Sequence, residues 1–405
     1  MRSARSWGSP PPDRTRGRGT RRVAAVQPLR LGMVGGGEGA FIGAIHRMAA
    51  ALDGDWRLTA GAFSTDAGRN ARTGELLGLD AARVYDTLDA LVAGEAALPE
   101  GERIDAVAVV TPNYLHAPMA IAALNAGFHV FCEKPMAMNV AEAVAIADAA
   151  KASGRHFGLA FTYSAYLLVE EARLRVERGD LGAIRLVQVE YLQGWLSLPI
   201  DTGGNKQAEW RTDPARAGMG GCLGDIGTHA FQLAEHVSGL RVASVSADLS
   251  THVAGRRLDD DVSALLRFDT DARGMLKASQ VAAGEENGLK LRVYGERGGL
   301  EWAQMEPNTL TLRWLDRPTE VVRAGGPGLD PRSVALGRTP AGHPEGYIEA
   351  FANLYRAFAA TIRGDANRWY PGISDGLRTM RFIEAMITNA SSDQKWTMVD
   401  SGESA

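Results

Sequence analysis

Short apolar runs alternate with helical patterns from residue 29 to residue 161, and this alternation limits the possible folds more than any other feature. Strands separated by whole helices do not pair through tight hairpins, so they are expected to run parallel. The continuous apolar run at 105–110 indicates a strand buried on both faces. The sequence therefore predicts an α/β fold with a doubly wound parallel sheet. Its strands are expected at 29–34, 56–63, 105–110, 129–132 and 157–161, and its helices at 43–52, 67–77, 114–126 and 140–152.

The pattern changes near residue 184. Apolar and polar residues alternate at 187–191, 289–293 and 310–314, which is typical of strands with one polar face. Little helix separates the strands after residue 240, so we expect a large, mainly antiparallel sheet. Two long helices are expected at 345–362 and 375–389. The chain of 405 residues is long enough for two domains, which we place at 29–160 and 161–399, with the last helices packing back on the first domain.

The first 28 residues differ from the rest. They contain seven arginines and a single acid, Asp13, and we expect a disordered basic tail. The whole chain carries a net charge of −4 and has no apolar run long enough to cross a membrane, so neither nucleic acid nor a membrane is an expected partner. Two cysteines, Cys132 and Cys222, form no zinc spacing and no disulfide framework, which favours a reducing cytoplasm and no metal site.

A glycine-rich segment follows the first strand and precedes the first helix. It reads Gly35-Gly36-Gly37-Glu38-Gly39-Ala40-Phe41-Ile42-Gly43. Glycines let the backbone approach a pyrophosphate, and a helix N-terminus supplies amide donors to it. In this context the segment predicts a dinucleotide site that involves Gly35, Gly36, Gly37, Phe41 and Ile42; the alternative is a glycine-rich surface turn.

The end of the second strand bears on the choice of cofactor. NAD-binding folds usually place an acid there to hold the ribose diol. Ser64 occupies the expected position of that acid, and Arg69 follows it. A hydroxyl beside a cation would accept a 2′-phosphate without repulsion, so the sequence favours NADP over NAD, although Asp66 can still serve the diol if the turn is shifted.

Two further strand ends carry polar residues. Thr111, Pro112, Asn113 and His116 follow the buried strand 105–110, beside the expected cofactor, and are predicted to contact it. His116 can equally be a helix-start residue.

Glu133-Lys134-Pro135 follows the strand 129–132. Pro135 excludes the α region for Lys134 and so restricts its backbone. A lysine at a strand end beside a cofactor is a candidate for acid–base chemistry, and the alternative is a solvated corner lysine. Glu133 and Lys134 are also expected to line the cofactor.

A second glycine run, at 220–224, precedes Asp225 and His229. Residues four apart share one face of a helix, so the carboxylate is expected to orient the imidazole. Such a pair suits proton transfer near neutral pH. The alternative is a surface pair without a role.

Together these motifs resemble the Gfo/Idh/MocA oxidoreductase family, and the similarity runs from about residue 29 to residue 399. The resemblance implies a Rossmann domain followed by an α/β domain with a large open sheet, assembled into homodimers or homotetramers through that sheet. It implies that Lys134, Asp225 and His229 are catalytic and that residues 111–113 line the cofactor. One departure is the glycine loop, which is about three residues longer than the compact Gly-x-Gly-x-x-Gly of the family.

The resemblance and these residues together predict hydride transfer between a secondary alcohol of a sugar or cyclitol and NAD or NADP, with His229 as the base. Substrate contacts are expected from the three catalytic residues and from Tyr163, Trp210, Arg211 and His343, with Trp195 as a further candidate. Two alternatives stay open. One is glycoside cleavage through transient oxidation on a retained NAD, and the other is a nucleotide sensor without catalysis.

Overall fold

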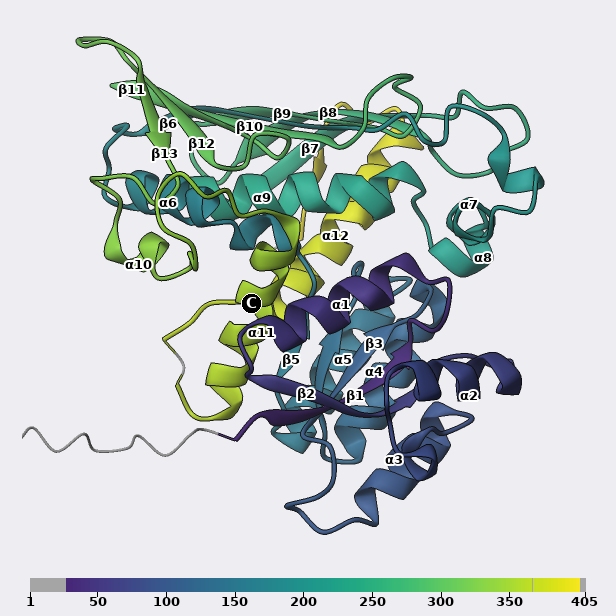
Figure 1. Cartoon of the computed structure of the whole chain (residues 1–405). Helices are drawn as coiled ribbons and strands as arrows, with labels where there is room; N and C mark the ends of the chain where they lie inside the picture. Colours follow the sequence, from purple (N-terminus) through teal and green to yellow (C-terminus); the bar gives the residue numbers. More distant parts are fainter. Residues whose placement is uncertain (1–26, 366, 401–405) are drawn as a thin grey trace, which may run out of the picture.

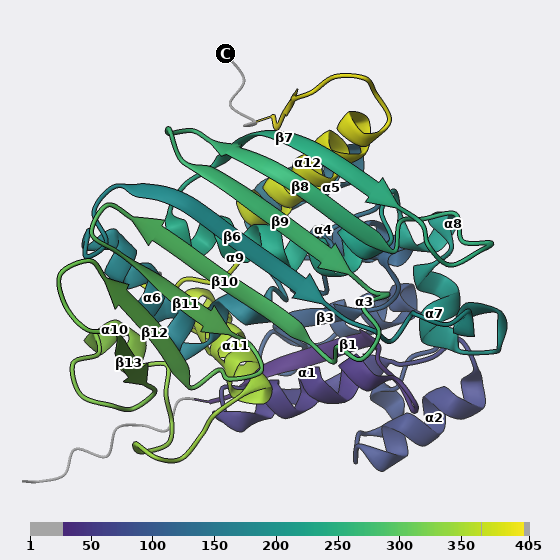
Figure 2. The same cartoon turned by 90° about the horizontal axis from the view of Figure 1, so that it is seen from above.

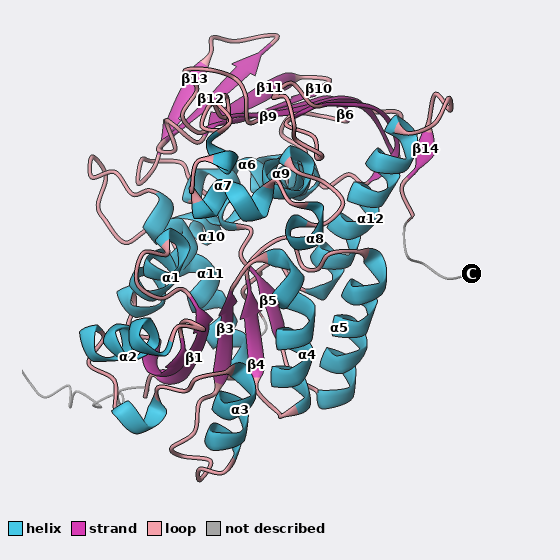
Figure 3. Cartoon of the chain, turned by 90° about the vertical axis from the view of Figure 1, so that its right-hand side faces the viewer, coloured by secondary structure: helices cyan, strands magenta, loops and turns pink. Residues whose placement is uncertain are grey.

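The computed structural model describes residues 27–365 and 367–400. A five-stranded sheet and a nine-stranded sheet form two layers, with helices between them (Figure 1). Figure 3 shows the helices Leu167–Glu177 and Thr228–Ser238 lying directly under the second sheet, on the side of the first sheet.

The first sheet is parallel throughout, with the strand order β2-β1-β3-β4-β5. This order reverses between β1 and β3, and ligands of doubly wound folds bind outside the carboxyl ends of the strands at such a point. Its strands are β1 (Leu29–Gly35), β2 (Trp56–Ala62), β3 (Ala106–Val110), β4 (His129–Cys132) and β5 (Phe157–Leu159). Its helices are α1 (Phe41–Leu52), α2 (Ala67–Leu76), α3 (Leu88–Ala96), α4 (His116–Asn125) and α5 (Val140–Ser153).

The second sheet has the order β13-β12-β11-β10-β6-β9-β8-β7-β14. Its pairs are antiparallel except for β6 and β9, which run parallel. The prediction of an α/β fold with a parallel sheet and a mainly antiparallel one is therefore confirmed. Its strands are β6 (Ile184–Leu192), β7 (Val242–Ser250), β8 (Asp261–Phe268), β9 (Arg273–Ser279), β10 (Gly288–Gly295), β11 (Gly298–Ala303), β12 (Thr309–Trp314), β13 (Glu320–Arg323) and β14 (Thr397–Met398).

One face of the second sheet is covered by helices and the other is open. Figure 2 looks onto the open face, with α9 and α12 visible behind the strands. Alternate residues such as Leu289, Leu291 and Val293 are buried against the helices, which explains why the polar residues between them face outward. The helices of this half are α6 (Leu167–Glu177), α7 (Lys206–Arg211), α8 (Pro214–Ala217), α9 (Thr228–Ser238), α10 (Pro331–Val334), α11 (Tyr347–Ile362) and α12 (Ile373–Ala390).

Helix α11 returns to the first sheet and packs beside α1. Tyr355 of α11 bonds through its hydroxyl to His46 Nδ1 of α1 at 2.7 Å, and Trp56 Nε1 donates to the Tyr355 carbonyl at 2.9 Å. The rings of Phe131, Phe351 and Tyr355 are buried and contact one another between the helix and the sheet. In the described ranges no helix is long and apolar enough to cross a membrane, and no group of acidic, histidine or cysteine side chains is placed to hold a metal ion. The basic tail predicted for residues 1–28 lies almost wholly outside the described residues.

Candidate active site

A cleft of about 930 Å³ opens between the two sheets, at the carboxyl ends of β1, β3 and β4. Both halves of the chain line it. The first half contributes the glycine loop, Ser64, Arg69, residues 110–113, Glu133 and Lys134. The second half contributes Asp225, His229 and residues around α7. The predicted cofactor and catalytic residues, His116 excepted, therefore meet in one cavity.

The glycine loop has the close approach that a pyrophosphate site needs. Gly36 has a φ of +70°, and a side chain on Gly43 would come within 2.3 Å of the Gly36 backbone. Helix α1 begins directly after the loop, at Phe41, so its free amide groups face the cleft. Because the helix starts two residues earlier than predicted, Phe41 and Ile42 form its first turn.

The corner at the end of β2 is built around helix α2. The Asp66 carboxylate accepts the Arg69 backbone N–H at 2.7 Å and caps the helix. This backbone bond lowers the pKa of Asp66. Ser64 and Arg69 line the cleft, and Glu38, which sequence reasoning passed over, lines it too and pairs with Arg72 at 3.4 Å.

The residues after β3 divide into two groups. The cleft lining includes Thr111, Pro112 and Asn113. The buried Thr111 Oγ1 has no hydrogen-bond partner within the described chain, so it is able to bond a bound cofactor. Asn113 already donates its amide to the Ala217 carbonyl of α8 at 2.9 Å, which ties the two halves together. His116 does not line the cleft. It is buried and bonds the carbonyls of Pro135 and Thr111, so it links two strand-end loops.

Lys134 and Asp225 form an ion pair across the cleft. The Lys134 ammonium donates to Asp225 Oδ1 at 2.9 Å and to the Asp225 carbonyl at 2.7 Å. Asp225 Oδ2 accepts from Gln280 Nε2 at 2.8 Å and from Arg211 Nε at 3.2 Å. Burial alone would raise the pKa of Asp225, but the charges of Lys134 and Arg211 outweigh it and hold that pKa far below its usual value.

His229 does not bond to Asp225, contrary to the expectation that the carboxylate orients it. Asp225 lies in a π-helical turn, Leu223–Gly227, and its oxygens face Lys134, Arg211 and Gln280 instead. Aromatic rings hold the imidazole: Phe161 and Tyr163 meet it edge-on at centroid distances of 5.4 and 4.8 Å. Burial, and then the Lys134 charge, lower the pKa of His229 well below its ordinary value, so the ring is neutral near pH 7.

The Glu133 carboxylate bonds helix α1 and the backbone of residue 134, and it makes no bond to the Lys134 ammonium. It bonds His46 Nε2 at 2.9 Å and accepts the Lys134 backbone N–H at 3.1 Å. Burial would raise the pKa of Glu133, but the bond to His46 outweighs it and the pKa is lowered. Glu133 therefore anchors the Lys134 backbone to helix α1.

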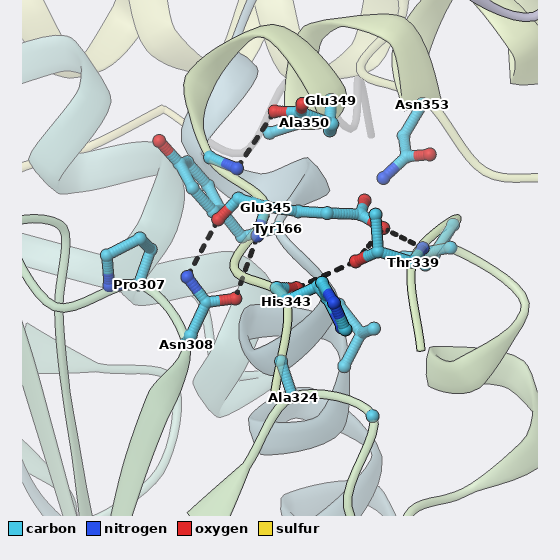
Figure 4. Close-up of a pocket in the computed structure, with 15 residues that line it drawn as sticks. Tyr166, Pro307, Asn308, Ala324, Thr339, His343, Glu345, Glu349, Ala350 and Asn353 are labelled. Carbon is cyan, nitrogen blue, oxygen red and sulfur yellow. Dashed lines mark hydrogen bonds between the residues drawn. The ribbon is translucent and has the colours of Figure 1, made fainter. Parts of the chain in front are cut away.

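The predicted substrate contacts separate into two places. Tyr163, Trp195, Trp210 and Arg211 all line the cleft, and the Arg211 guanidinium lies 4.2 Å from the Trp210 ring centroid. His343 lies in another pocket of about 30 Å³, room for a water molecule or two, shown in Figure 4. Its carbonyl accepts from Thr339 there, and we leave His343 out of the site. Cleft residues that sequence reasoning missed include Glu38, Tyr191, Gln193, Lys206, Arg216 and Tyr347.

The parallel sheet, the glycine loop and the cleft at its strand ends define a dinucleotide-binding protein with a Rossmann fold. Sequence models described as an oxidoreductase family with an NAD-binding Rossmann fold and as a GFO/IDH/MocA C-terminal domain match residues 29–161 and 169–301. The chain belongs to the Gfo/Idh/MocA family of oxidoreductases.

Individual relatives extend over nearly the whole chain. An inositol dehydrogenase homologue from Azotobacter vinelandii, solved with NAD+, is 38% identical with a TM-score of 0.89, covering 93% of this chain and 98% of the other. The uncharacterized oxidoreductase YfiI of Bacillus subtilis is 34% identical over 91% of this chain and 96% of its own length. Levoglucosan dehydrogenase of Pseudarthrobacter phenanthrenivorans is 31% identical over 68% of this chain and 73% of its own.

Proposed function

We propose that this protein oxidises a secondary alcohol of a sugar, glycoside or cyclitol, reversibly, with NAD or NADP as the hydride acceptor. The observation that carries the proposal is the half-buried Lys134–Asp225 ion pair, which lines the cofactor cleft together with His229. The similarity to an inositol dehydrogenase homologue and to levoglucosan dehydrogenase supports the substrate class. When bound, the nicotinamide supplies the hydride chemistry.

Lys134 is suited to stabilise an alkoxide. An ammonium has three N–H donors, and Asp225 takes two of them, through its carbonyl and Oδ1. The third donor is left for the substrate oxygen, and Asp225 fixes its direction. Donors held in place before the reaction stabilise the developing charge without reorganising.

His229 is suited to accept the proton of that hydroxyl. A base must be unprotonated at the working pH, and the lowered pKa of His229 keeps it neutral there. Phe161 and Tyr163 contact its ring, and neither ring nitrogen is hydrogen-bonded to another described residue. Both nitrogens are therefore available to the substrate. We assign Lys134 and His229 to the reacting oxygen and Asp225 to orienting Lys134.

The ribose corner supports binding of NADP as well as NAD. The Asp66 carboxylate is held by the amides of α2, while Ser64 and Arg69 face the cleft. Glu38 also lines the cleft, and its carboxylate pairs with Arg72 at 3.4 Å.

The open face of the second sheet supports self-association. Leu186, Leu265 and Met275 lie about half exposed on neighbouring strands, at 46%, 51% and 49%. We propose that this face is covered in a homodimer or homotetramer. A Leu265→Glu, Met275→Glu double variant should then reduce the mass seen by light scattering to that of one chain.

Both cysteines are buried free thiols, which is compatible with our proposal of a cytoplasmic enzyme.

A panel of cyclitols, sugars and glycosides, assayed by NAD(P)H absorbance, tests the function. We expect turnover of at least one polyol, a loss of two or more orders of magnitude in Lys134→Met, and little change in Lys290→Met on the second sheet. Lys134→Met should still bind NADH, as measured by fluorescence. Unchanged turnover in Lys134→Met would overturn the assignment.

A further inference from the structure

A closed ring of hydrogen bonds joins Tyr163, Tyr191 and Asn287 beside His229. Tyr163 and Tyr191 line the cleft, and the half-buried Asn287 bonds to both. The two hydroxyl oxygens are 2.6 Å apart. Asn287 Oδ1 lies 2.6 Å from the Tyr191 hydroxyl, and Asn287 Nδ2 lies 3.2 Å from the Tyr163 hydroxyl.

The directions of these bonds follow from Trp195. An indole N–H can only donate, so Gln193 must present its oxygen to Trp195 Nε1, at 3.1 Å. Gln193 therefore turns its nitrogen toward Asn287, 2.8 Å away, and Asn287 must present its oxygen in return. This leaves the Asn287 nitrogen as the donor to Tyr163. One donor-only group thus fixes two amide orientations.

Both phenolic protons are consequently used inside the ring. Tyr191 donates to Asn287 Oδ1, so Tyr163 must donate to the Tyr191 oxygen. The remaining lone pair of the Tyr191 oxygen faces the second amide hydrogen of Gln193, at 3.4 Å. Tyr163 donates one bond and accepts one, and keeps one lone pair. Burial raises the pKa of both tyrosines, so they stay protonated near neutral pH.

We propose that the Tyr163 hydroxyl oxygen is an acceptor-only subsite that binds one non-reacting hydroxyl of the substrate and rejects a phosphate, carboxylate or ether oxygen there. The subsite lies beside the base, because the Tyr163 and His229 ring centroids are 4.8 Å apart. Tyr163 is a specificity-determining residue and gives no proton to the reaction. The proposal rests on the proposed function for the polyol class of the substrate.

The loss of affinity on replacing the recognised hydroxyl follows from the loss of its hydrogen bond to the Tyr163 oxygen. A fluorine in place of the recognised hydroxyl has nearly its size but donates no hydrogen bond, and would set two acceptors against each other. Loss of one such bond lowers affinity by roughly 10- to 100-fold.

The test uses calorimetric titration of the NADH complex with myo-inositol, levoglucosan and their monodeoxyfluoro analogues. In the wild type, fluorine at one non-reacting carbon should weaken binding about 10- to 100-fold. Tyr191→Phe removes the acceptor of the Tyr163 proton, which becomes free to donate, and the penalty at that carbon should fall below about threefold. Penalties at the reacting carbon, which Lys134 recognises, should persist. Asn287→Leu should act as Tyr191→Phe does, and Tyr294→Phe on β10 should change nothing.

The inference is overturned if fluorine is tolerated at every non-reacting carbon, if Tyr191→Phe and Asn287→Leu keep the full penalty, or if neither polyol binds. Failure of the proposed function is distinguishable from this. Binding with the expected fluorine pattern but without NADH formation from NAD+ would refute the dehydrogenase and leave the subsite standing.

Discussion

Replacing Asp225 by Asn removes the one negative charge between Lys134 and Arg211. The carboxylate accepts from Lys134 at 2.9 Å, from Gln280 at 2.8 Å and from Arg211 at 3.2 Å. An amide of the same shape has a single oxygen. Whichever way it is turned, its nitrogen faces a donor, so at least one buried donor loses its acceptor.

The size of the effect can be worked from these distances. Two unit charges 2.9 Å apart attract by about 6 kcal/mol at an effective dielectric constant of about 20, as an upper figure. Removal of one partner from a buried pair costs about 3–5 kcal/mol in stability, and the lower end is expected here because Lys134 keeps its bond to the backbone carbonyl of residue 225. A misdirected Lys134 loses a donor to the alkoxide, which costs about 100- to 1,000-fold in turnover.

The assay compares kcat/KM for the best polyol, the Kd of NADH by fluorescence and the free energy of unfolding by urea. We expect kcat/KM to fall about 100-fold or more, while the Kd of NADH changes less than about threefold because Asp225 is not assigned to the nucleotide. Asp248→Asn, on the exposed face of β7, is the matched control. A folded Asp225→Asn enzyme with wild-type turnover would refute the reasoning.

Three further predictions concern other parts of the chain. Burial, and then Arg173, lower the pKa of His236 to about 3. As the pH falls, the imidazole of the unfolded chain is therefore protonated first, and the stability that is fully present above about pH 6.5 is lost. In urea unfolding, wild type should lose roughly 2 kcal/mol more than His236→Gln between about pH 7 and pH 5. Ser64→Asp should raise the Kd of NADPH at least about tenfold and leave that of NADH within about threefold, since an added carboxylate repels the 2′-phosphate; equal changes for both would contradict the role of this corner. Asn113→Ala should remove the tie to α8 and lower the free energy of unfolding by about 1 kcal/mol, whereas no change would show that the bond contributes nothing.

The first half of the fold could be predicted because its signals are local. The strand, glycine loop and helix at 29–52 follow each other directly, and the predicted strand ends lie within a few residues of those observed. Helix α3 was missed, because in its short Leu88–Ala96 span only Leu88, Leu91 and Glu95 are buried, too few for a clear period. The parallel pairing of β6 with β9 was also missed, since alternation is the same in parallel and antiparallel strands.

The site was predictable in its residue types and less so in its bonds. Spacing placed Asp225 and His229 on one face, but a contact between residues 91 positions apart decides where the carboxylate points. Gln280 and Asn287 escaped notice because each follows a strand or turn with no local motif, and only the assembled sheet brings them into contact with Asp225 and Tyr163. His343 was misplaced for the same reason, because its distance from the cleft is set by how the chain between β13 and α11 folds.

The central claim is a net transfer of hydride from a carbon of the substrate to the nicotinamide, with NADH as a product, and isotope transfer tests it most directly. The best polyol of the panel is prepared with deuterium at its CH–OH carbons and incubated with the enzyme and NAD+, and the NADH formed is analysed by mass spectrometry. We predict NADH that carries one deuterium, together with a ketone product and a slower rate than with the unlabelled polyol. Release of sugar from a glycoside with no net NADH, or deuterium found only in water, would contradict the claim and favour the glycoside-cleaving alternative.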